Sequence, residues 1–232
     1  MHIMLFCQDM DSVTMAQQKI FTGLEEAMQS PDKVYRLQLK KKGLKEIPKE
    51  VFLFPNLMEL DLSRNKIAIV PAAINTLKNL KILNLANNRL TEFQTAICEL
   101  KMLSILNVAN NKIDALPAEI GALSNLTYLN AENNKITLLT PSIGQLIKLK
   151  SLILNRNNFS IMPPEIGNLL NLTYLDLWGT LITRFPDEIG KLKNNLKAVD
   201  LRVTVISYDR QRHIQELLPD TDINFSKACN CP

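Results

Sequence analysis

Residues 57–79, LMELDLSRNKIAIVPAAINTLKN, set the architecture of this chain, because their pattern returns every 23 residues. The next blocks read LKILNLANNRLTEFQTAICELKM from Leu80, LSILNVANNKIDALPAEIGALSN from Leu103, LTYLNAENNKITLLTPSIGQLIK from Leu126 and LKSLILNRNNFSIMPPEIGNLLN from Leu149. A unit this short cannot bury its own apolar face and must stack on its neighbours. Self-similarity at a fixed short period therefore predicts a solenoid.

Each unit begins with L-x-x-L-x-L and ends with P-x-x-I-x-x-L. The first pattern has period two over Leu83 and Leu85, which predicts a short strand with both leucines pointing inward. All strands then run in one direction and form a parallel sheet with neighbours about 4.8 Å apart. The second pattern, as in Pro117, Ile120 and Leu123, predicts a single 3₁₀ or α turn on the outer face.

An asparagine follows the predicted strand in most units. Its amide both donates and accepts hydrogen bonds, so it can satisfy backbone groups of its own turn and of the adjacent turn. Stacked amides keep a buried polar row hydrogen-bonded, as burial requires. The predicted structural ladder consists of Asn65, Asn88, Asn111, Asn134 and Asn157. In the outer units, Lys42 suits an exposed end, and Thr180 and Thr204 can make part of the same bonds.

The combined pattern, L-x-x-L-x-L-x-x-N-x-I/L-x-x-x-P-x-x-I-x-x-L, resembles the leucine-rich repeat family over residues 34–207. The resemblance implies an α/β solenoid, a curved array of about eight units with a parallel concave sheet and short 3₁₀ or α turns on the convex side. Units of 23 residues look like those of bacterial secreted or surface proteins and of intracellular scaffolds. The fold does not by itself fix a function.

The start of a solenoid needs a cap that covers the core of the first unit. Thr22 followed by Glu25 matches a capping box, which predicts the beginning of a helix. Leu24, Ala27 and Met28 give this helix an apolar face. We therefore expect a helical N-terminal cap.

The other end carries a pattern that resembles a terminal cap of the same family. Ile214 and Leu217 predict a helix that ends before Pro219, and Ile223 and Phe225 predict a last short strand. The predicted divisions are a flexible segment or signal-peptide stub at 1–21, a helical cap at 22–33, repeats at 34–207, a helix-strand cap at 208–227 and a tail at 228–232.

Composition argues against several kinds of partner. A net charge of +4 is modest for 232 residues. The one basic cluster, Lys40, Lys41, Lys42 and Lys45, is expected to be a solvated end of the array, so we expect no nucleic-acid partner. No run approaches the roughly 20 apolar residues of a membrane span. The missing cysteine-flanked caps leave the location uncertain, with a secreted or cell-surface bacterial protein slightly favoured over a cytoplasmic one.

The sequence contains no recognisable catalytic or metal-binding pattern. Its two histidines, His2 and His213, lie near opposite ends, so no Ser-His-Asp or Cys-His arrangement can be placed on one surface. Cys98 stands where other units carry glycine and is expected to be a free thiol. The pair Cys229 and Cys231 lacks the second ligand cluster that zinc needs. We therefore expect no enzyme activity, no metal site and no cofactor.

Positions three, five and seven of each L-x-x-L-x-L-x-x point outward from the sheet, so each position forms a column across the units. The predicted partner-binding residues lie in these columns: Ile82, Asn84, Ile105, Asn107, Tyr128, Asn130, Glu132, Ile153, Tyr174, Asp176, Trp178 and Arg202. Exposed apolar and aromatic groups often mark interaction sites, and Tyr and Trp anchor many protein–protein hot spots. We therefore predict a protein or peptide partner on the concave sheet.

Other interpretations of this surface stay open at the level of sequence. Isoleucine and tyrosine favour strands in any case, and the amide row could be a cross-strand ladder that only stabilises the sheet. Stacking of a sugar on Trp178 and Tyr174 beside Asp176 would make the protein a carbohydrate-binding or adhesion module. An enzyme would have to rely on carboxylates such as Glu132 and Asp176. Self-association through the concave face or an uncapped end is a further hypothesis.

Overall fold

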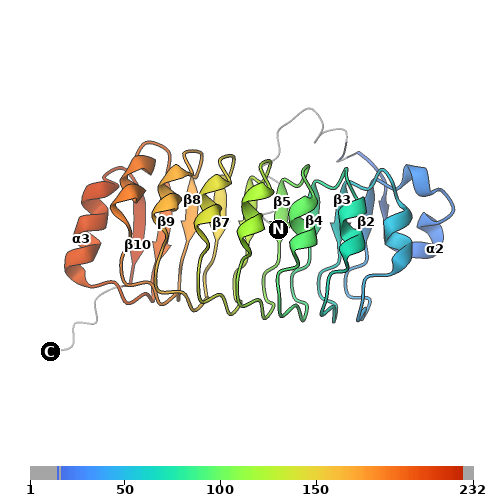
Figure 1. The fold of residues 1–232 in the computed structure, drawn as a ribbon, viewed down its shortest axis with the longest axis horizontal. Helices are drawn as coiled ribbons and strands as arrows, with labels where there is room; N and C mark the ends of the chain where they lie inside the picture. Colours follow the sequence, from blue (N-terminus) through green and yellow to red (C-terminus); the bar gives the residue numbers. More distant parts are fainter. Residues whose placement is uncertain (1–14, 16, 227–232) are drawn as a thin grey trace.

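The computed structural model describes residue 15 and residues 17–226 of the chain. In this part the strands form a ten-stranded parallel sheet whose order follows the sequence (Figure 1). The strands are β1 (Ile20–Phe21), β2 (Arg36–Gln38), β3 (Glu59–Asp61), β4 (Ile82–Asn84), β5 (Ile105–Asn107), β6 (Tyr128–Asn130), β7 (Ser151–Ile153), β8 (Tyr174–Asp176), β9 (Ala198–Leu201) and β10 (Asp222–Phe225). Strands β2 to β9 come from the predicted repeat units, so the predicted solenoid is confirmed.

The turns that back the sheet are 3₁₀ helices, and Figure 1 shows them on one side of it. They are η2 (Pro31–Lys33), η3 (Lys49–Leu53), η4 (Ala72–Thr76), η5 (Thr95–Glu99), η6 (Ala118–Ala122), η7 (Pro141–Gln145), η8 (Pro164–Asn168) and η9 (Asp187–Leu192). The α-helices α2 (Leu24–Ala27) and α3 (Tyr208–Leu217) lie at the two ends. None of the helices in the described residues has the length and hydropathy of a transmembrane span.

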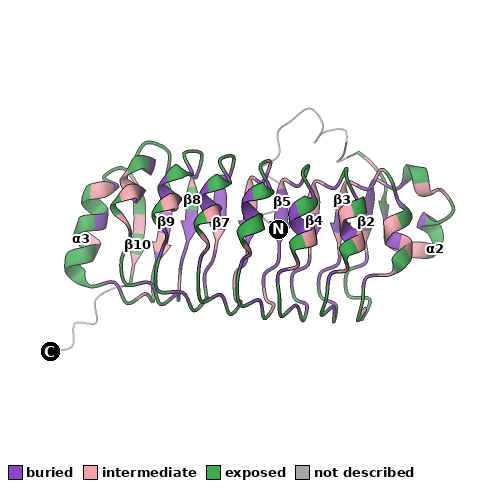
Figure 2. Ribbon diagram, viewed as in Figure 1, coloured by how far each residue is buried: buried purple, intermediate pink, exposed green. Residues whose placement is uncertain are grey.

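One continuous apolar core lies between the sheet and the turns. Figure 2 accordingly colours much of the sheet as buried and large parts of the outer turns as exposed. The strand leucines Leu83 and Leu85 are fully buried, and so are Ile120 and Leu123 of the outer turn. Each such side chain contributes about 2 kcal/mol when it leaves water. Because the pattern repeats, every unit covers the apolar face of the next.

The asparagine row is buried, except for the half-buried Asn111, and each member makes the same set of hydrogen bonds. In Asn157, Oδ1 accepts from the N–H of Ile136 at 3.0 Å, and Nδ2 donates to the carbonyls of Ala131 and Leu154 at 2.9 Å each. Equivalent bonds are made by Asn65, Asn88, Asn111 and Asn134. The row therefore joins each unit to its neighbours through backbone groups that would otherwise be buried without partners.

The ladder changes at the C-terminal end, where threonine replaces asparagine. Thr180 and Thr204 donate from Oγ1 to the carbonyls of Leu177 and Leu201 at 2.8 and 2.6 Å. These bonds stay within one unit, because a hydroxyl lacks the second polar atom that reaches the neighbouring unit. The threonines thus make part of the asparagine bonds, as the sequence predicts.

A second asparagine row, which the sequence analysis missed, lies where each outer turn returns to the next strand. Each Nδ2 atom donates to a carbonyl of the preceding unit, at distances between 2.7 and 3.0 Å. The donors are Asn56, Asn79, Asn125, Asn171 and Asn195, and the acceptors are Asp32, Pro55, Lys101, Ile147 and Leu170. Because these bonds are exposed to water, each contributes less than a bond of the buried ladder.

The N-terminal cap is helical, but its start differs from the prediction. Gly23, and not Thr22, is the N-cap residue of α2, and no side chain caps this end. The predicted capping box is therefore wrong. Gly23 is extended, with φ −146° and ψ 148°, because the chain arrives from a strand and turns into the helix only at the next residue. Met28 is exposed, so the apolar face of the cap is shorter than predicted.

The sheet also begins earlier than predicted. Ile20 and Phe21 pair in parallel with Arg36 and Leu37 of β2, and Phe21 is buried. The prediction of a flexible segment through residue 21 is wrong for these two residues, since a strand this short shows no period in the sequence. Residues 1–14 and 16 of that segment, and the tail with Cys229 and Cys231, lie outside the described residues.

The predicted helix-strand cap at the C-terminal end is confirmed. Helix α3 buries Ile214, the following Leu218 is also buried, and β10 pairs in parallel with β9. His213 lies on the exposed side of α3, with Nε2 2.8 Å from the carboxylate of Asp187. The histidine is therefore a surface residue of the cap.

The residue before each ladder position adopts a left-handed backbone with positive φ. Lys41, Arg64, Asn87, Asn110, Asn133, Arg156 and Val203 have φ between 50° and 58°, and Gly179 has φ 66°. Asparagine and glycine tolerate this region, whereas a β-branched residue is a genuine outlier there. Val203 is therefore the strained member of this column.

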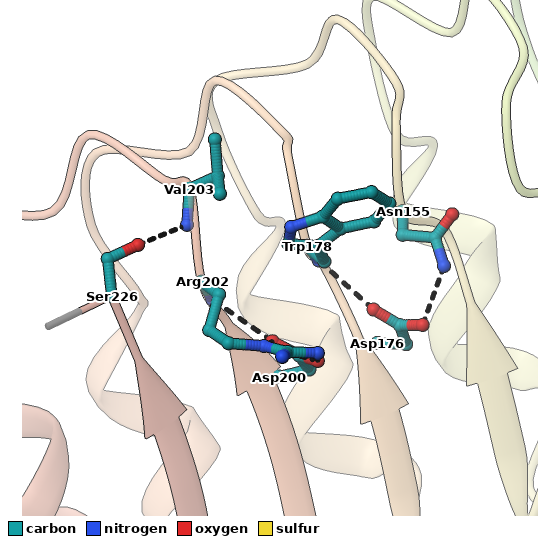
Figure 3. A network of polar contacts seen from close by, with 7 residues as sticks. All are labelled: Asn155, Asp176, Trp178, Asp200, Arg202, Val203 and Ser226. Atoms are coloured by element: carbon teal, nitrogen blue, oxygen red, sulfur yellow. Dashed lines mark hydrogen bonds and ion pairs between the residues drawn. The ribbon is translucent and has the colours of Figure 1, made fainter.

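Replacing Val203 with asparagine is expected to raise the free energy of unfolding by about 1 kcal/mol, because it relieves the left-handed strain. Little packing is lost, since Val203 is 64% exposed. The backbone N–H of Val203, which donates to Ser226 Oγ at 2.6 Å, is kept (Figure 3). Urea unfolding measures the change, and Val205→Asn is the control because Val205 is 60% exposed with φ outside the left-handed region. An equal gain in both variants would contradict the strain argument.

Candidate functional site

The strand register aligns the outward side chains into columns, as the sequence predicts. Ile82 pairs with Ile105, and Ile105 pairs with Tyr128, and the same register continues across the sheet. Backbone bonds extend the stacking to the seventh position, where the N–H of Arg156 donates to the carbonyl of Trp178 at 2.8 Å. We call the surface formed by these three columns on β2 to β9 the sheet face.

Packing between neighbouring columns buries part of the predicted site. Ile105, Asn107, Asn130 and Asp176 are between 6% and 9% exposed, so the prediction that they form open surface is wrong. Side chains on strands about 4.8 Å apart shield one another. Of the remaining predicted residues, Ile82, Asn84, Tyr128, Glu132, Ile153 and Trp178 are half-buried, and Tyr174 and Arg202 are exposed. The accessible part of the site lies toward its C-terminal end.

The amide row has a structural role at the end of each strand. Oδ1 of Asn84, Asn107 and Asn130 accepts from the backbone N–H two residues further on, at 3.1, 3.0 and 2.9 Å. Asp61 and Asp176 make the same contact through a carboxylate oxygen. Such bonds are Asx turns, which stay within one unit. The amides of Asn84, Asn107 and Asn130 therefore stabilise local turns and do not form the cross-strand ladder that the sequence analysis left open.

The N-terminal end of the sheet face is closed by an ion pair. Arg36 Nε lies 2.6 Å from Glu59 Oε2, and the two side chains are 8% and 12% exposed. Gln38 adds a bond from Nε2 to Glu59 Oε1 at 3.4 Å. A buried pair of this kind satisfies its own charges and leaves little free charge for a partner.

Two tyrosines on the sheet face stand on either side of a small residue. Tyr128 and Tyr174 are the two register neighbours of Ser151, which is buried. Two strand spacings, about 9.6 Å, separate the tyrosine backbones, and Ile153 points outward from the strand between them. Burial raises the pKa of both tyrosine hydroxyls. Both groups therefore stay protonated at neutral pH and can donate hydrogen bonds.

Trp178 is held in place by its neighbours (Figure 3). Asp176 accepts from the backbone N–H of Trp178 through Oδ1 at 3.1 Å and from Asn155 Nδ2 through Oδ2 at 2.6 Å. The guanidinium of Arg156 lies 4.3 Å from the centroid of the indole ring, a cation–π distance. The Asp176 bond fixes the backbone of Trp178, and the Arg156 contact restricts the indole itself, which lowers the entropy that binding would cost.

Arg202 and Asp200 form the outer rim of this cluster (Figure 3). Arg202 donates from Nε and from one terminal nitrogen to Asp200, with distances of 3.0 and 2.6 Å. Partial burial raises the pKa of Asp200, but the hydrogen bonds and charge of Arg202 outweigh it and hold the pKa below its usual value. The rim is therefore a formed ion pair at neutral pH.

Replacing Asp176 with asparagine is expected to raise the free energy of unfolding at neutral pH by up to about 1 kcal/mol. Burial raises the pKa of Asp176, although the bonds from Asn155 and the Trp178 N–H oppose it. A carboxyl whose pKa is higher in the folded state stabilises the fold when protonated, and this contribution is lost as pH rises through the folded pKa. Urea unfolding of both proteins from about pH 3 to 7 measures the difference, which should grow with pH. A difference independent of pH would contradict the assignment.

The structure adds residues that the sequence analysis did not place in the site. Arg156 was missed, although its position next to the seventh column brings it over Trp178 of the following unit. Asn155 was missed because its role depends on Asp176, and it is only 7% exposed. Among the described residues, no group of three or more His, Cys, Asp and Glu side chains could hold a metal ion.

Comparison with known proteins identifies the family. Leucine-rich repeat models match residues 32–90, 78–136 and 148–169. Together with the parallel sheet and its 3₁₀ turns, these matches show that the chain belongs to the leucine-rich repeat family. No curated protein matches the sequence.

Solved structures share the fold. A leucine-rich repeat protein of Leptospira interrogans is 31% identical with a TM-score of 0.66, over 84% of this chain and 62% of that protein. Internalin C2 of Listeria monocytogenes is 23% identical with a TM-score of 0.72, over 84% and 82% of the two chains. The ectodomain of the Arabidopsis thaliana receptor kinase GASSHO1/SCHENGEN3, in complex with CASPARIAN STRIP INTEGRITY FACTOR 2, is 24% identical with a TM-score of 0.65, over 92% and 30%. Leucine-rich repeat proteins of this fold generally mediate protein–protein interactions.

Proposed function

We propose that the C-terminal half of the sheet face, on strands β6 to β9, binds a protein or peptide partner. The observation that carries the proposal is the exposed Tyr174 on the same face as Trp178, whose indole packs against Arg156 and whose backbone N–H is bound by Asp176. Preordered aromatic side chains are the typical anchors of hot spots. Tyr128 and Ile153 extend the same surface toward the middle of the array.

The proposed role is binding without catalysis. The family supports it, because leucine-rich repeats are typically interaction modules. The plant receptor ectodomain of the same fold was solved in complex with CASPARIAN STRIP INTEGRITY FACTOR 2. On the proposed site, Asp176 is engaged by Asn155 and the Trp178 N–H, and Asp200 is engaged by Arg202. These carboxylates act as structural acceptors, which suits a recognition surface.

Carbohydrate binding is the weaker candidate. A sugar would stack on the indole, but Arg156 already lies over one face of the Trp178 ring. At most the other face remains for stacking. The partner surface also continues through aliphatic Ile153, which offers nothing to sugar hydroxyls.

A binding experiment with Tyr174→Ala tests the proposed function. Proteins captured by the wild type are identified, and their affinity is then measured with purified components. We expect Tyr174→Ala and Trp178→Ala each to weaken binding about 30-fold, the effect of a hot spot worth about 2 kcal/mol. Each variant must first show the circular dichroism spectrum of the wild type.

Tyr208→Ala is the matched control. Tyr208 is a more exposed tyrosine, at 73% against 37% for Tyr174, and it lies on α3 outside the sheet face. We expect its removal to leave the affinity unchanged. Equal loss in Tyr174→Ala and Tyr208→Ala, or no loss in either, would move the binding site away from the sheet face. Binding of glycans but not of proteins, lost in Trp178→Ala, would favour the carbohydrate alternative.

A further inference from the structure

A row of basic side chains runs along one long edge of the array, away from the sheet face. Its members directly follow the ladder asparagines: Lys66, Arg89, Lys112 and Lys135. Their backbone N–H groups donate to carbonyls of the preceding unit, at Leu44, Ile67, Leu90 and Ile113, with distances of 2.7 to 2.8 Å. The four residues therefore stack one above another at the strand spacing of about 4.8 Å. Figure 1 shows the connections that follow the strands aligned along this edge.

All four side chains are exposed, and none of them makes an ion pair within the described residues. Lys41, Lys42 and Arg64 are also exposed, and they lie in the neighbouring columns, at the ladder position of the first unit or just before it in the first two units. The sequence analysis found only the basic cluster around Lys40, whose residues are close together in the chain. It missed this row because the members of the row are 23 residues apart. The charges of the row repel one another. Exposed Glu92 and Asp114 lie near Arg89 and Lys112 and offset part of this repulsion, but neither makes an ion pair with the row within the described residues.

Exposed aliphatic side chains accompany the basic row. Ile69 and Leu138 follow Lys66 and Lys135 by three residues, and they are 66% and 64% exposed. The apolar surface continues along the same edge through Ile161, Leu181 and Val205, which are 56%, 51% and 60% exposed. Backbone bridges align Ala115 with Leu138, and Ile161 with Arg184, in the same parallel arrangement. The edge thus offers charge and apolar contact together.

We propose that this edge docks on an anionic lipid membrane, with the basic row on the headgroups and the aliphatic side chains in the interface. Lysine and arginine near an anionic bilayer, beside large aliphatic residues, are the two contributions that hold a protein on a membrane surface. A nucleic acid would use the charges but leave the aliphatic groups unexplained. Of the exposed aromatic side chains of the described part, Tyr174 lies on the sheet face and Tyr208 lies beyond the basic row at the C-terminal end, so no aromatic side chains alternate with the row to stack bases.

Sedimentation with lipid vesicles tests the proposal. The probe is phosphatidylcholine vesicles with about one third phosphatidylserine, compared with phosphatidylcholine alone. We expect the wild type to bind the anionic vesicles and to dissociate at high salt. The edge variant Lys66→Gln/Arg89→Gln/Lys112→Gln/Lys135→Gln should lose about a thousandfold in partition, since each cation near the surface adds about 1 kcal/mol. Failure of the wild type to bind anionic vesicles at low salt would overturn the proposal.

The matched control removes the same charge elsewhere. Lys78, Lys148, Lys191 and Lys193 are exposed and lie in or after the outer turns. Their simultaneous change to glutamine should cost less than about tenfold, because charges beyond a Debye length are screened. An equal loss of partition in both variants would mean that only the net charge of the protein matters, and it would overturn the proposal. Duplex DNA that displaces the protein from vesicles and binds it more tightly would overturn it in favour of a nucleic acid.

Two further variants test whether a loss of vesicle binding comes from unfolding or from charge alone. The edge variant should melt at the same temperature as the wild type or higher at low salt, because it removes repulsion. If it does not fold, Lys112→Gln/Lys135→Gln is used, with an expected loss of about 30-fold. Leu138→Ser/Ile161→Ser keeps every charge and should weaken partition about tenfold or more. Unchanged partition in this variant would contradict the apolar half of the proposal.

Discussion

Asn157→Ala is expected to lower the free energy of unfolding by about 4 kcal/mol. Asn157 is 1% exposed, so water cannot replace its bonds. Truncation leaves the N–H of Ile136 and the carbonyls of Ala131 and Leu154 without the amide that now binds them. Each buried unsatisfied group costs about 1–3 kcal/mol. Urea unfolding followed by circular dichroism measures the loss.

Two control variants assign this loss to buried cross-unit bonds. Asn157→Thr copies Thr180, whose hydroxyl keeps the bond within the unit, and should cost about half as much. Asn171→Ala removes an exposed amide that donates to Ile147 at 2.7 Å, and should cost less than about 1 kcal/mol. If Asn157→Ala cost no more than Asn171→Ala, burial of the ladder would not be the source of its stabilising effect.

The repeat made most of the fold predictable. Its fixed period aligns every strand, so Leu83 and Leu106 had to become register partners once the units stacked. The helix-strand cap was predictable for a different reason, because Pro219 ends the helix and Ile223 and Phe225 alternate after it. The N-terminal strand could not be found in this way. Its two residues pair with β2 only because the first unit offers an open edge.

The candidate site was predictable as a set of columns but not as a surface. Sequence gives the order of side chains on the sheet face, whereas their exposure depends on how neighbouring columns pack. Ile105 is 6% exposed and Tyr174 is 37% exposed, although both occupy position three. The contact of Arg156 with Trp178 joins two units at different positions, which a column-by-column analysis does not compare. The basic edge was missed for the same reason, since its signal is one repeated position and not a run.

The proposed partner site and the proposed membrane-binding edge can be used at the same time, because they lie on different parts of the solenoid. The side chains of the proposed partner site project from the sheet, whereas the basic row lies on the connections that leave it. A protein docked on a membrane by this edge would keep Tyr174 and Trp178 free to meet a partner. The two proposals fail separately, because the edge variant should leave partner affinity unchanged in the absence of vesicles.

Gly144→Ala is expected to lower the free energy of unfolding by about 2–3 kcal/mol, because the outer turns of adjacent units touch at this position. A Cβ placed on Gly144 would lie within contact of the Glu165 backbone carbonyl oxygen, 2.7 Å from Glu165 Cβ and 3.0 Å from its carbonyl carbon. Backbone atoms of η8 cannot move aside as a side chain can. The glycine is needed here for close approach, since its φ lies outside the left-handed region.

Gly190→Ala is the control, since Gly190 holds in η9 the position that Gly144 holds in η7. The nearest atom to a Cβ there is Leu217 Cδ2, at 3.3 Å, which is the end of a flexible side chain. We therefore expect a change of less than about 1 kcal/mol. Cys98 occupies the equivalent position in η5, so a side chain fits there where the next turn leaves room. Burial raises the pKa of its thiol to about 12, so the thiol stays protonated. Equal destabilisation in both glycine variants would mean that helix packing between η7 and η8 does not limit the spacing of the units.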